Sequence, residues 1–252
     1  SLYNSTTAFY NIAIGDYSLW SNTTGQSNLG MGYRALYTNT TGIYNTALGN
    51  NALALNTTGS DNIAIGPWAL TANNAGNTNI AFGSFALTSN TSGANNIGIG
   101  YNAQVLNATG NNQVRIGDAN ITYAGIQVPW TTTSHKRWKD NIQPSNLGLS
   151  FINQLKPVSY TRKNDVKKSV EYGFIAQELQ ASLQKFGVEN AGIISTDDNG
   201  MLGVRYNDLL APMILATQEQ QKQILEQQKQ ILELQKLIIE MKEKLDSLND
   251  KF

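Results

Sequence analysis

The chain has 252 residues, of which 18 are basic and 18 are acidic, so its formal net charge is zero. This balance argues against a nucleic-acid partner and against binding to a membrane surface. The absence of cysteine excludes disulfides and thiolate metal sites, and no run of about 18 apolar residues is present that could span a membrane.

The charged residues are distributed unevenly. Residues 134–252 contain 31 of the 36 ionised side chains, and residues 1–133 contain only Asp16, Arg34, Asp61, Arg115 and Asp118. The first ten residues, "SLYNSTTAFY", have neither a charged segment nor an apolar core, so they form no signal peptide. They already resemble the pattern that follows them, which we interpret as the sign of a fragment of a longer chain.

The N-terminal half repeats with a period of 17 residues. Each unit follows the pattern N-x-A-I-G-x-x-A-L-x-x-N-T-T-G-x-x. Glycine recurs at this period in two series, and asparagine and leucine follow it too: Gly15, Gly32, Gly49, Gly66, Gly83, Gly100 and Gly117; Gly25, Gly42, Gly59, Gly76, Gly93 and Gly110; Asn11, Asn28, Asn45, Asn62, Asn79 and Asn96, then Gln113; Leu19, Leu36, Leu53, Leu70 and Leu87. Fixed periods of this size are typical of solenoids.

Each unit predicts one coil of a β-solenoid. The alternation in "NIAIG" favours a short strand with one buried face, and we expect the glycines to mark corners with positive φ. Each unit has only about four sizeable apolar side chains, so we expect stacked neighbours to bury them together. Triplets such as Asn22-Thr23-Thr24 match the glycan-acceptor pattern, but we interpret them as turn chemistry because they arise from the repeat itself.

The C-terminal half predicts a small α+β region and a long helix. We expect a short helix around Leu147–Leu155, then a strand after the proline that follows it. "VEYGFIAQELQASL" predicts a strand that passes through a glycine into a helix, and "GIISTDDNGMLGVRY" predicts a hairpin that turns at Asp198-Asn199-Gly200. From Asn207 onward the pattern indicates one helix.

This last helix carries heptads typical of a coiled coil. The a positions are Ile224, Ile231, Ile238 and Leu245, and the d positions are Gln227, Leu234, Met241 and Leu248. Gln227 is interpreted as fixing the register, and Glu, Lys and Gln are expected to keep the rest of the helix polar. Ile at a with Leu at d would also fit a dimer, and a single amphipathic helix on a core is the alternative.

The repeat resembles the left-handed parallel β-roll of trimeric autotransporter adhesin heads and of related phage tail-fibre segments. The similarity covers about residues 8–120 and depends on the N-x-A-I-G and A-L elements. The adhesin-head repeat is usually shorter than the 17 residues found in this chain.

Residues 134–252 resemble the C-terminal intramolecular chaperone of phage tail spikes and tail fibres, the peptidase S74 family. The similarity is carried by "SHKRWKDNIQPSNLGLSFINQLKPVSYTRK", "YGFIAQELQ" and "VRYNDLLAPMILATQEQQKQI". It implies a domain that forms a homotrimer, drives folding of the β-structured fibre before it, and then cuts itself off. The expected fold is thus a trimeric parallel β-roll, a small α+β domain and a three-stranded coiled coil.

The same resemblance implies a catalytic dyad of Ser134 and Lys139, with cleavage at the Ser134–His135 bond in place of the family's usual Ser-Asp bond. A serine hydroxyl needs a base, and lysine is a base only when burial or nearby cations make it neutral. Lys136 and Arg137 supply such cations. Two other interpretations stay open for "HKRWK", a solvated basic loop and a phosphate-binding patch, and His135 is an alternative base in awkward geometry.

The predicted domains are 1–125 (β-roll), 126–133 (linker), 134–206 (chaperone core) and 207–252 (trimerisation helix). We expect a structural virion protein at the tip of a tail fibre, which binds a host receptor or glycan. After assembly its chaperone domain is released in the host cytoplasm. Any enzymatic activity is one self-cleavage, with no external substrate, cofactor, metal, nucleic acid or membrane insertion.

Two alternatives are a bacterial trimeric adhesin and a glycan-degrading tailspike. The first should end in membrane-spanning strands, whereas this chain ends in "EKLDSLNDKF". Against the second, the repeat region holds only Asp16, Asp61 and Asp118 as carboxylates, in separate coils. We expect no aromatic cluster to mark a binding face, and assign Tyr10, Tyr33, Tyr44 and Tyr101 to packing at corners rather than to contacts with sugar rings.

Overall fold

The computed structural model describes residues 1–121, 123–127, 131–163, 165–189 and 192–249. Residues 128–130 of the predicted linker lie outside these described residues. The chain divides into two compact units, each of which is described by itself. The first unit is Ser1–Val128 with Lys163–Lys167 and Thr196–Met201, and the second is Pro129–Arg162, Lys168–Ser195 and Leu202–Phe252.

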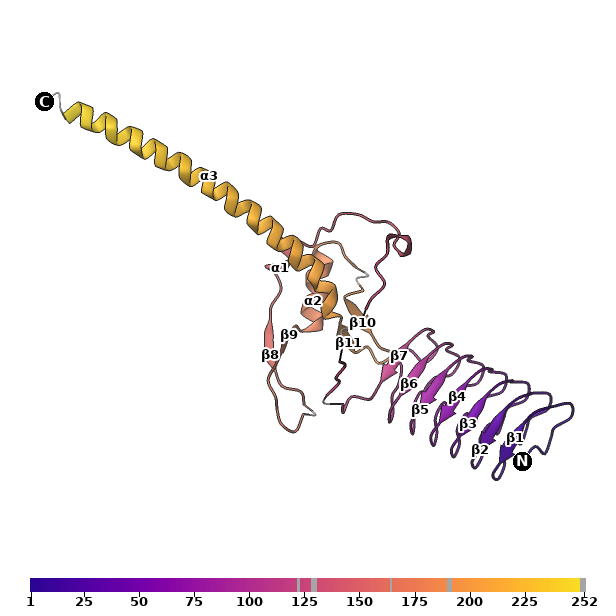
Figure 1. Ribbon diagram of the computed structural model, residues 1–252. Coiled ribbons are helices and arrows are strands. Elements are labelled where there is room, and N and C mark those ends of the chain that lie inside the picture. The colour runs from indigo at the N-terminus through magenta and orange to yellow at the C-terminus, as the bar shows by residue number, and fades with distance from the viewer. Residues whose placement is uncertain (122, 128–130, 164, 190–191, 250–252) are drawn as a thin grey trace. The chain divides into compact units, whose positions relative to one another are not determined.

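The repeat region is a β-solenoid, as predicted (Figure 1). Its seven strands form one parallel sheet in chain order: β1 (Ile12–Ile14), β2 (Leu29–Met31), β3 (Thr46–Leu48), β4 (Ile63–Ile65), β5 (Ile80–Phe82), β6 (Ile97–Ile99) and β7 (Val114–Ile116). Each residue pairs with the one 17 positions later, as Ile12 does with Leu29. One repeat unit is therefore one coil.

The interior of the solenoid is built from small side chains and one leucine per coil. Leu19, Leu36, Leu53, Leu70 and Leu87 are fully buried, together with the central strand alanines Ala47, Ala64 and Ala81. The large strand residues on either side of these alanines point outward, and Ile14 is 53% exposed. The expectation that neighbouring coils bury all the large apolar residues was wrong, because the narrow coil accommodates only alanine or glycine at most strand centres.

Two columns of buried asparagine run through the stacked coils. In the first column each Nδ2 donates to the Oδ1 of the preceding asparagine, as Asn39 does to Asn22 at 2.8 Å, and to a glycine carbonyl three residues on. The members of this column are Asn22, Asn39, Asn56, Asn73 and Asn90. Their complete burial agrees with the interpretation of the N-T-T triplets as turn chemistry.

The two glycine series serve different purposes. The series that includes Gly15 has positive φ, between 73° and 138°, as predicted. The series that includes Gly25 does not, and is required by space. A Cβ on Gly59 would lie 2.3 Å from Asn56 Oδ1 and 2.5 Å from the carbonyl oxygen of Gly76.

Gly59→Ala is expected to destabilise the solenoid by about 3 kcal/mol, because the added methyl group overlaps a backbone carbonyl that stacking holds in place. The measurement is the midpoint of guanidinium unfolding followed by circular dichroism. Gly192→Ala is the control, since its Cβ would lie no closer than 3.2 Å to the flexible end of Arg205. Equal midpoints for the two variants would contradict the spatial explanation.

The second unit contains short helices and strands, then one long helix. In chain order these are η1 (Lys136–Trp138), α1 (Leu149–Ile152), β8 (Val158–Tyr160), β9 (Glu171–Gly173), α2 (Ala176–Lys185), β10 (Ile194–Thr196), β11 (Leu202–Val204), η2 (Tyr206–Leu209) and α3 (Leu210–Asn249). Strands β8 and β9 are antiparallel, and β10 forms a two-stranded sheet with β11. The predicted α+β region and C-terminal helix are confirmed, with α1 shorter than expected and a 3-10 turn before α3.

A small apolar core holds this unit together. Its buried members are Leu147, Phe151, Leu179, Leu183, Ile193 and Leu209. The N-terminal part of α3 is fastened to α1 by Glu219, whose carboxylate accepts a hydrogen bond from the Leu149 backbone N–H at 2.6 Å. A carboxylate at this position neutralises a free donor at the start of the helix. Beyond this attachment α3 continues as a long single helix (Figure 1).

Candidate functional site

The structure brings the side chains of Ser134 and Lys139 together. The 3-10 turn η1 reverses the chain between them, with the Trp138 N–H donating to the His135 carbonyl at 2.9 Å. Lys139 Nζ then donates to Ser134 Oγ at 2.8 Å. The two groups thus lie within the distance that proton transfer requires.

The environment of this pair is open. Ser134, Lys139 and the intervening residues are all exposed, so the chain by itself supplies the geometry of a dyad without the burial that makes lysine a base. His135 Nδ1 accepts a hydrogen bond from the Arg137 N–H at 3.2 Å, which uses one nitrogen of the alternative base to cap η1. A change of protonation at Lys139 would require cover from outside these residues.

Two of the sequence segments that carry the family resemblance meet in the second unit. The Phe174 N–H donates to Tyr206 Oη at 3.1 Å, and the two rings stack with centroids 6.1 Å apart. Gly173 leaves room for this hydroxyl, because a Cβ there would lie 2.2 Å from it. The "YGFIAQE" segment and "YNDLLAP" are therefore joined by a specific contact at the start of α3.

A polar cluster lies on the β8–β9 hairpin beside this contact. Glu171 forms an ion pair with Arg162 at 2.9 Å and accepts a hydrogen bond from Tyr160 Oη at 3.2 Å. Partial burial raises the pKa of Tyr160, and the hydrogen bond and charge of Glu171 raise it further. These contacts tie the two strands of the hairpin together.

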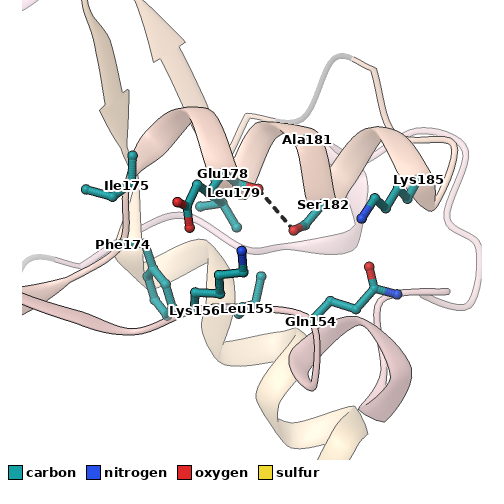
Figure 2. Close-up of a pocket in the computed structure, with 10 residues that line it drawn as sticks. All are labelled: Gln154, Leu155, Lys156, Phe174, Ile175, Glu178, Leu179, Ala181, Ser182 and Lys185. Atoms are coloured by element: carbon teal, nitrogen blue, oxygen red, sulfur yellow. Dashed lines mark hydrogen bonds between the residues drawn. The ribbon is translucent and has the colours of Figure 1, made fainter.

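A small hollow lies between α2 and the segment after α1 (Figure 2). Figure 2 shows Lys156 and Gln154 extending toward the side chains of α2 across it. The one hydroxyl, Ser182 Oγ, donates to the Glu178 carbonyl at 3.0 Å. The side chains that line the hollow therefore provide no pair of nucleophile and base.

The outer face of the solenoid sheet is apolar and exposed. It is formed by the first and third residues of the strands, and we call it the strand face. Its exposed members include Ile12, Ile14, Met31, Ile63, Ile80, Phe82, Ile99, Val114 and Ile116. Contiguous apolar surface of this kind is uncommon on monomeric proteins and marks interaction sites.

The predicted heptad positions of α3 are also exposed. Ile224, Ile231, Ile238 and Leu245 are between 40% and 58% exposed, so the seam packs against no other part of the described chain. The side chain of Leu248 lies outside the described residues. The prediction of polar residues elsewhere on the helix was wrong at the b positions, where Leu225, Leu232 and Ile239 are at least half exposed.

An aromatic cluster on the first coils was missed by the sequence analysis. Tyr3 and Trp20 stack with centroids 4.4 Å apart, Tyr17 packs against Trp20 at 5.1 Å, and Tyr17 also contacts Tyr33 and Tyr37 at 6.0 and 6.4 Å. The Arg34 guanidinium lies over the rings of Tyr33 and Tyr37, at 5.4 and 4.9 Å. The signal was the period itself, because positions 3, 20 and 37 are one register apart and stack on consecutive coils.

In the part of the chain that the structure describes, no group of three or more acidic or histidine side chains is placed to hold a metal ion. Nor is any helix there both long and apolar enough to cross a membrane.

Comparison with known proteins places one segment. Residues 134–188 match the family model of peptidase S74, described as the chaperone of endosialidase. No curated protein and no solved structure matches the chain. The segment that follows the solenoid, with Ser134 at its first position, is therefore similar to the chaperone of endosialidase.

Proposed function

We propose that this protein is part of a virion tail fibre whose C-terminal region is an intramolecular chaperone for the β-solenoid. The observation that carries the proposal is the order of the two parts: a solenoid of parallel coils followed at residue 134 by a segment similar to the chaperone of endosialidase. Parallel coils depend on contacts between neighbours and expose pairing edges while unfinished. A chaperone on the same chain supplies a starting point.

The working form is a homotrimer. Two exposed apolar surfaces support this, the strand face of the solenoid and the heptad seam of α3. A coiled coil at the C-terminus holds three chains in register and raises the local concentration of their solenoids. The assembled solenoids then form the fibre tip, which attaches to a receptor or glycan on the host surface.

Self-cleavage completes assembly. Trimer formation covers Lys139, its neutral amine takes the proton of the Ser134 hydroxyl, and this hydroxyl attacks a backbone carbonyl at the seam. His135 leaves as the new N-terminus and water hydrolyses the ester. The reaction occurs once per chain, and the chaperone is released in the host cytoplasm while the fibre persists kinetically.

Ser134→Ala and Lys139→Ala are each expected to abolish this cleavage. Wild type should give fragments 1–134 and 135–252, whose masses sum to that of the 27.5 kDa chain plus one water. The measurement is intact mass with a denaturing gel on freshly purified protein.

Thr133→Ala and Lys136→Ala are the matched controls, because they remove an exposed hydroxyl and an exposed amine from the same loop and should still be cut. A single 27.5 kDa species in wild type would contradict cleavage but leave the trimerising chaperone. The C-terminal half would then be a permanent trimerisation tip.

A further inference from the structure

We propose that the aromatic cluster on the first coils, with Arg34 at its centre, is a binding site for a carboxylate-bearing glycan. This proposal rests on the proposed function, in which the solenoid faces the host surface, and it names both the site and the class of ligand. The cluster consists of Tyr3, Tyr17, Trp20, Tyr33, Arg34 and Tyr37.

The rings of this cluster are exposed and mutually braced. Tyr3, Tyr17 and Tyr33 are 72%, 43% and 43% exposed, yet each contacts another ring of the cluster. Tyrosine and tryptophan offer an apolar face with a polar edge and lose little conformational freedom on binding. A pyranose ring has the complementary surface, with C–H groups on its faces and hydroxyls on its edge.

Arg34 supplies the charge that selects among glycans. Its guanidinium face is covered by Tyr33 and Tyr37, and it forms no ion pair with any described residue. The edges of its N–H groups stay available, and this planar fork matches the two oxygens of a carboxylate. The cation is one of only two in residues 1–133, so an acidic sugar meets a fixed positive point on an otherwise nearly uncharged surface.

A second aromatic group on the solenoid lacks this charge. Trp68 and Phe85 stack with centroids 5.2 Å apart, and Phe85 also contacts Tyr101, but no arginine or lysine lies over these rings among the described residues. Trp68 occupies the same register position as Arg34, two coils later. It therefore provides an aromatic surface of the same repeat without the carboxylate partner.

The test is binding of the full chain to an array of carboxylate-bearing glycans printed beside their methyl esters. Wild type should bind at least one acid form, and Arg34→Asn should weaken that binding about tenfold or more, as loss of a charged hydrogen bond does. Tyr17→Asn should weaken it similarly. Both variants introduce the residue that the repeat already uses at Asn51.

Two controls should bind like wild type: Trp68→Asn, which removes an aromatic ring from the same register position, and Arg115→Gln, which removes the other solenoid cation. Equal binding of acids and methyl esters, no binding by wild type, or an altered oligomeric state in Tyr17→Asn would each overturn the proposal. Assembly and cleavage are measured on the same samples, so failure of glycan binding with intact assembly overturns this site alone.

Discussion

Replacing Ile231 and Ile238 together with serine is expected to abolish trimerisation and leave the solenoid misfolded. Both side chains lie at a positions of α3 and are 54% and 53% exposed in the single chain. In a three-stranded coiled coil all six become buried, and each contributes about 1.5–3 kcal/mol. The loss is thus on the order of 10 kcal/mol per trimer.

Analytical ultracentrifugation measures the oligomeric state, and circular dichroism measures the strand content. The control replaces Leu232 and Ile239 with serine, which removes the same apolar area from b positions that are 59% and 56% exposed. That control should remain trimeric, because b positions lie outside the seam. A monomer with a fully formed solenoid after the Ile231/Ile238 change would show that the solenoid folds without α3.

Asn56→Leu is expected to destabilise the solenoid by about 3–6 kcal/mol per chain. Asn56 donates to Asn39 Oδ1 at 2.8 Å and to the Gly59 carbonyl at 2.9 Å, and accepts from Asn73 Nδ2 at 3.0 Å. Leucine has the same branching but makes none of these bonds. Three buried polar groups are therefore left without partners, at about 1–3 kcal/mol each.

The expected result is a large fall in the midpoint of thermal unfolding, measured by circular dichroism at fixed protein concentration. Asn77→Ala is the matched control, since Asn77 is exposed and its Oδ1 accepts one backbone hydrogen bond, from Ser60 at 2.7 Å. Its effect should stay below about 1 kcal/mol. A smaller change for Asn56→Leu than for Asn77→Ala would mean that the asparagine column contributes no stability.

The repeat made the solenoid predictable, because a period of 17 residues fixes which residues stack. The direction of the strand side chains was not predictable by the same means. Alternation in "NIAIG" indicates that Ala13 faces one way and Ile12 and Ile14 the other, but not which face is inside. The usual assumption places isoleucine in the core, whereas the structure places the small residue there and exposes both isoleucines.

The spacing of Ser134 and Lys139 is weak evidence for a dyad, and only the surrounding family pattern selected the pair. The turn η1 that brings Lys139 Nζ to Ser134 Oγ has no strong sequence signature. The aromatic cluster was missed for a different reason. Tyr17 and Trp20 appear isolated along the chain, and their contacts with Tyr3 and Tyr37 arise only when coils are aligned in register.

The asparagine columns make every internal coil interchangeable with its neighbours. Each coil presents an amide donor to one side and an amide acceptor to the other, so joining any two coils recreates the same junction. Unequal recombination within the gene would then lengthen or shorten the rod by whole coils, about 4.8 Å at a time, without new contacts. Gln113 takes the place of asparagine in the last unit, where its side-chain oxygen accepts from the Asn107 N–H. Rod length is thereby free to vary in evolution while both of its ends keep their own chemistry.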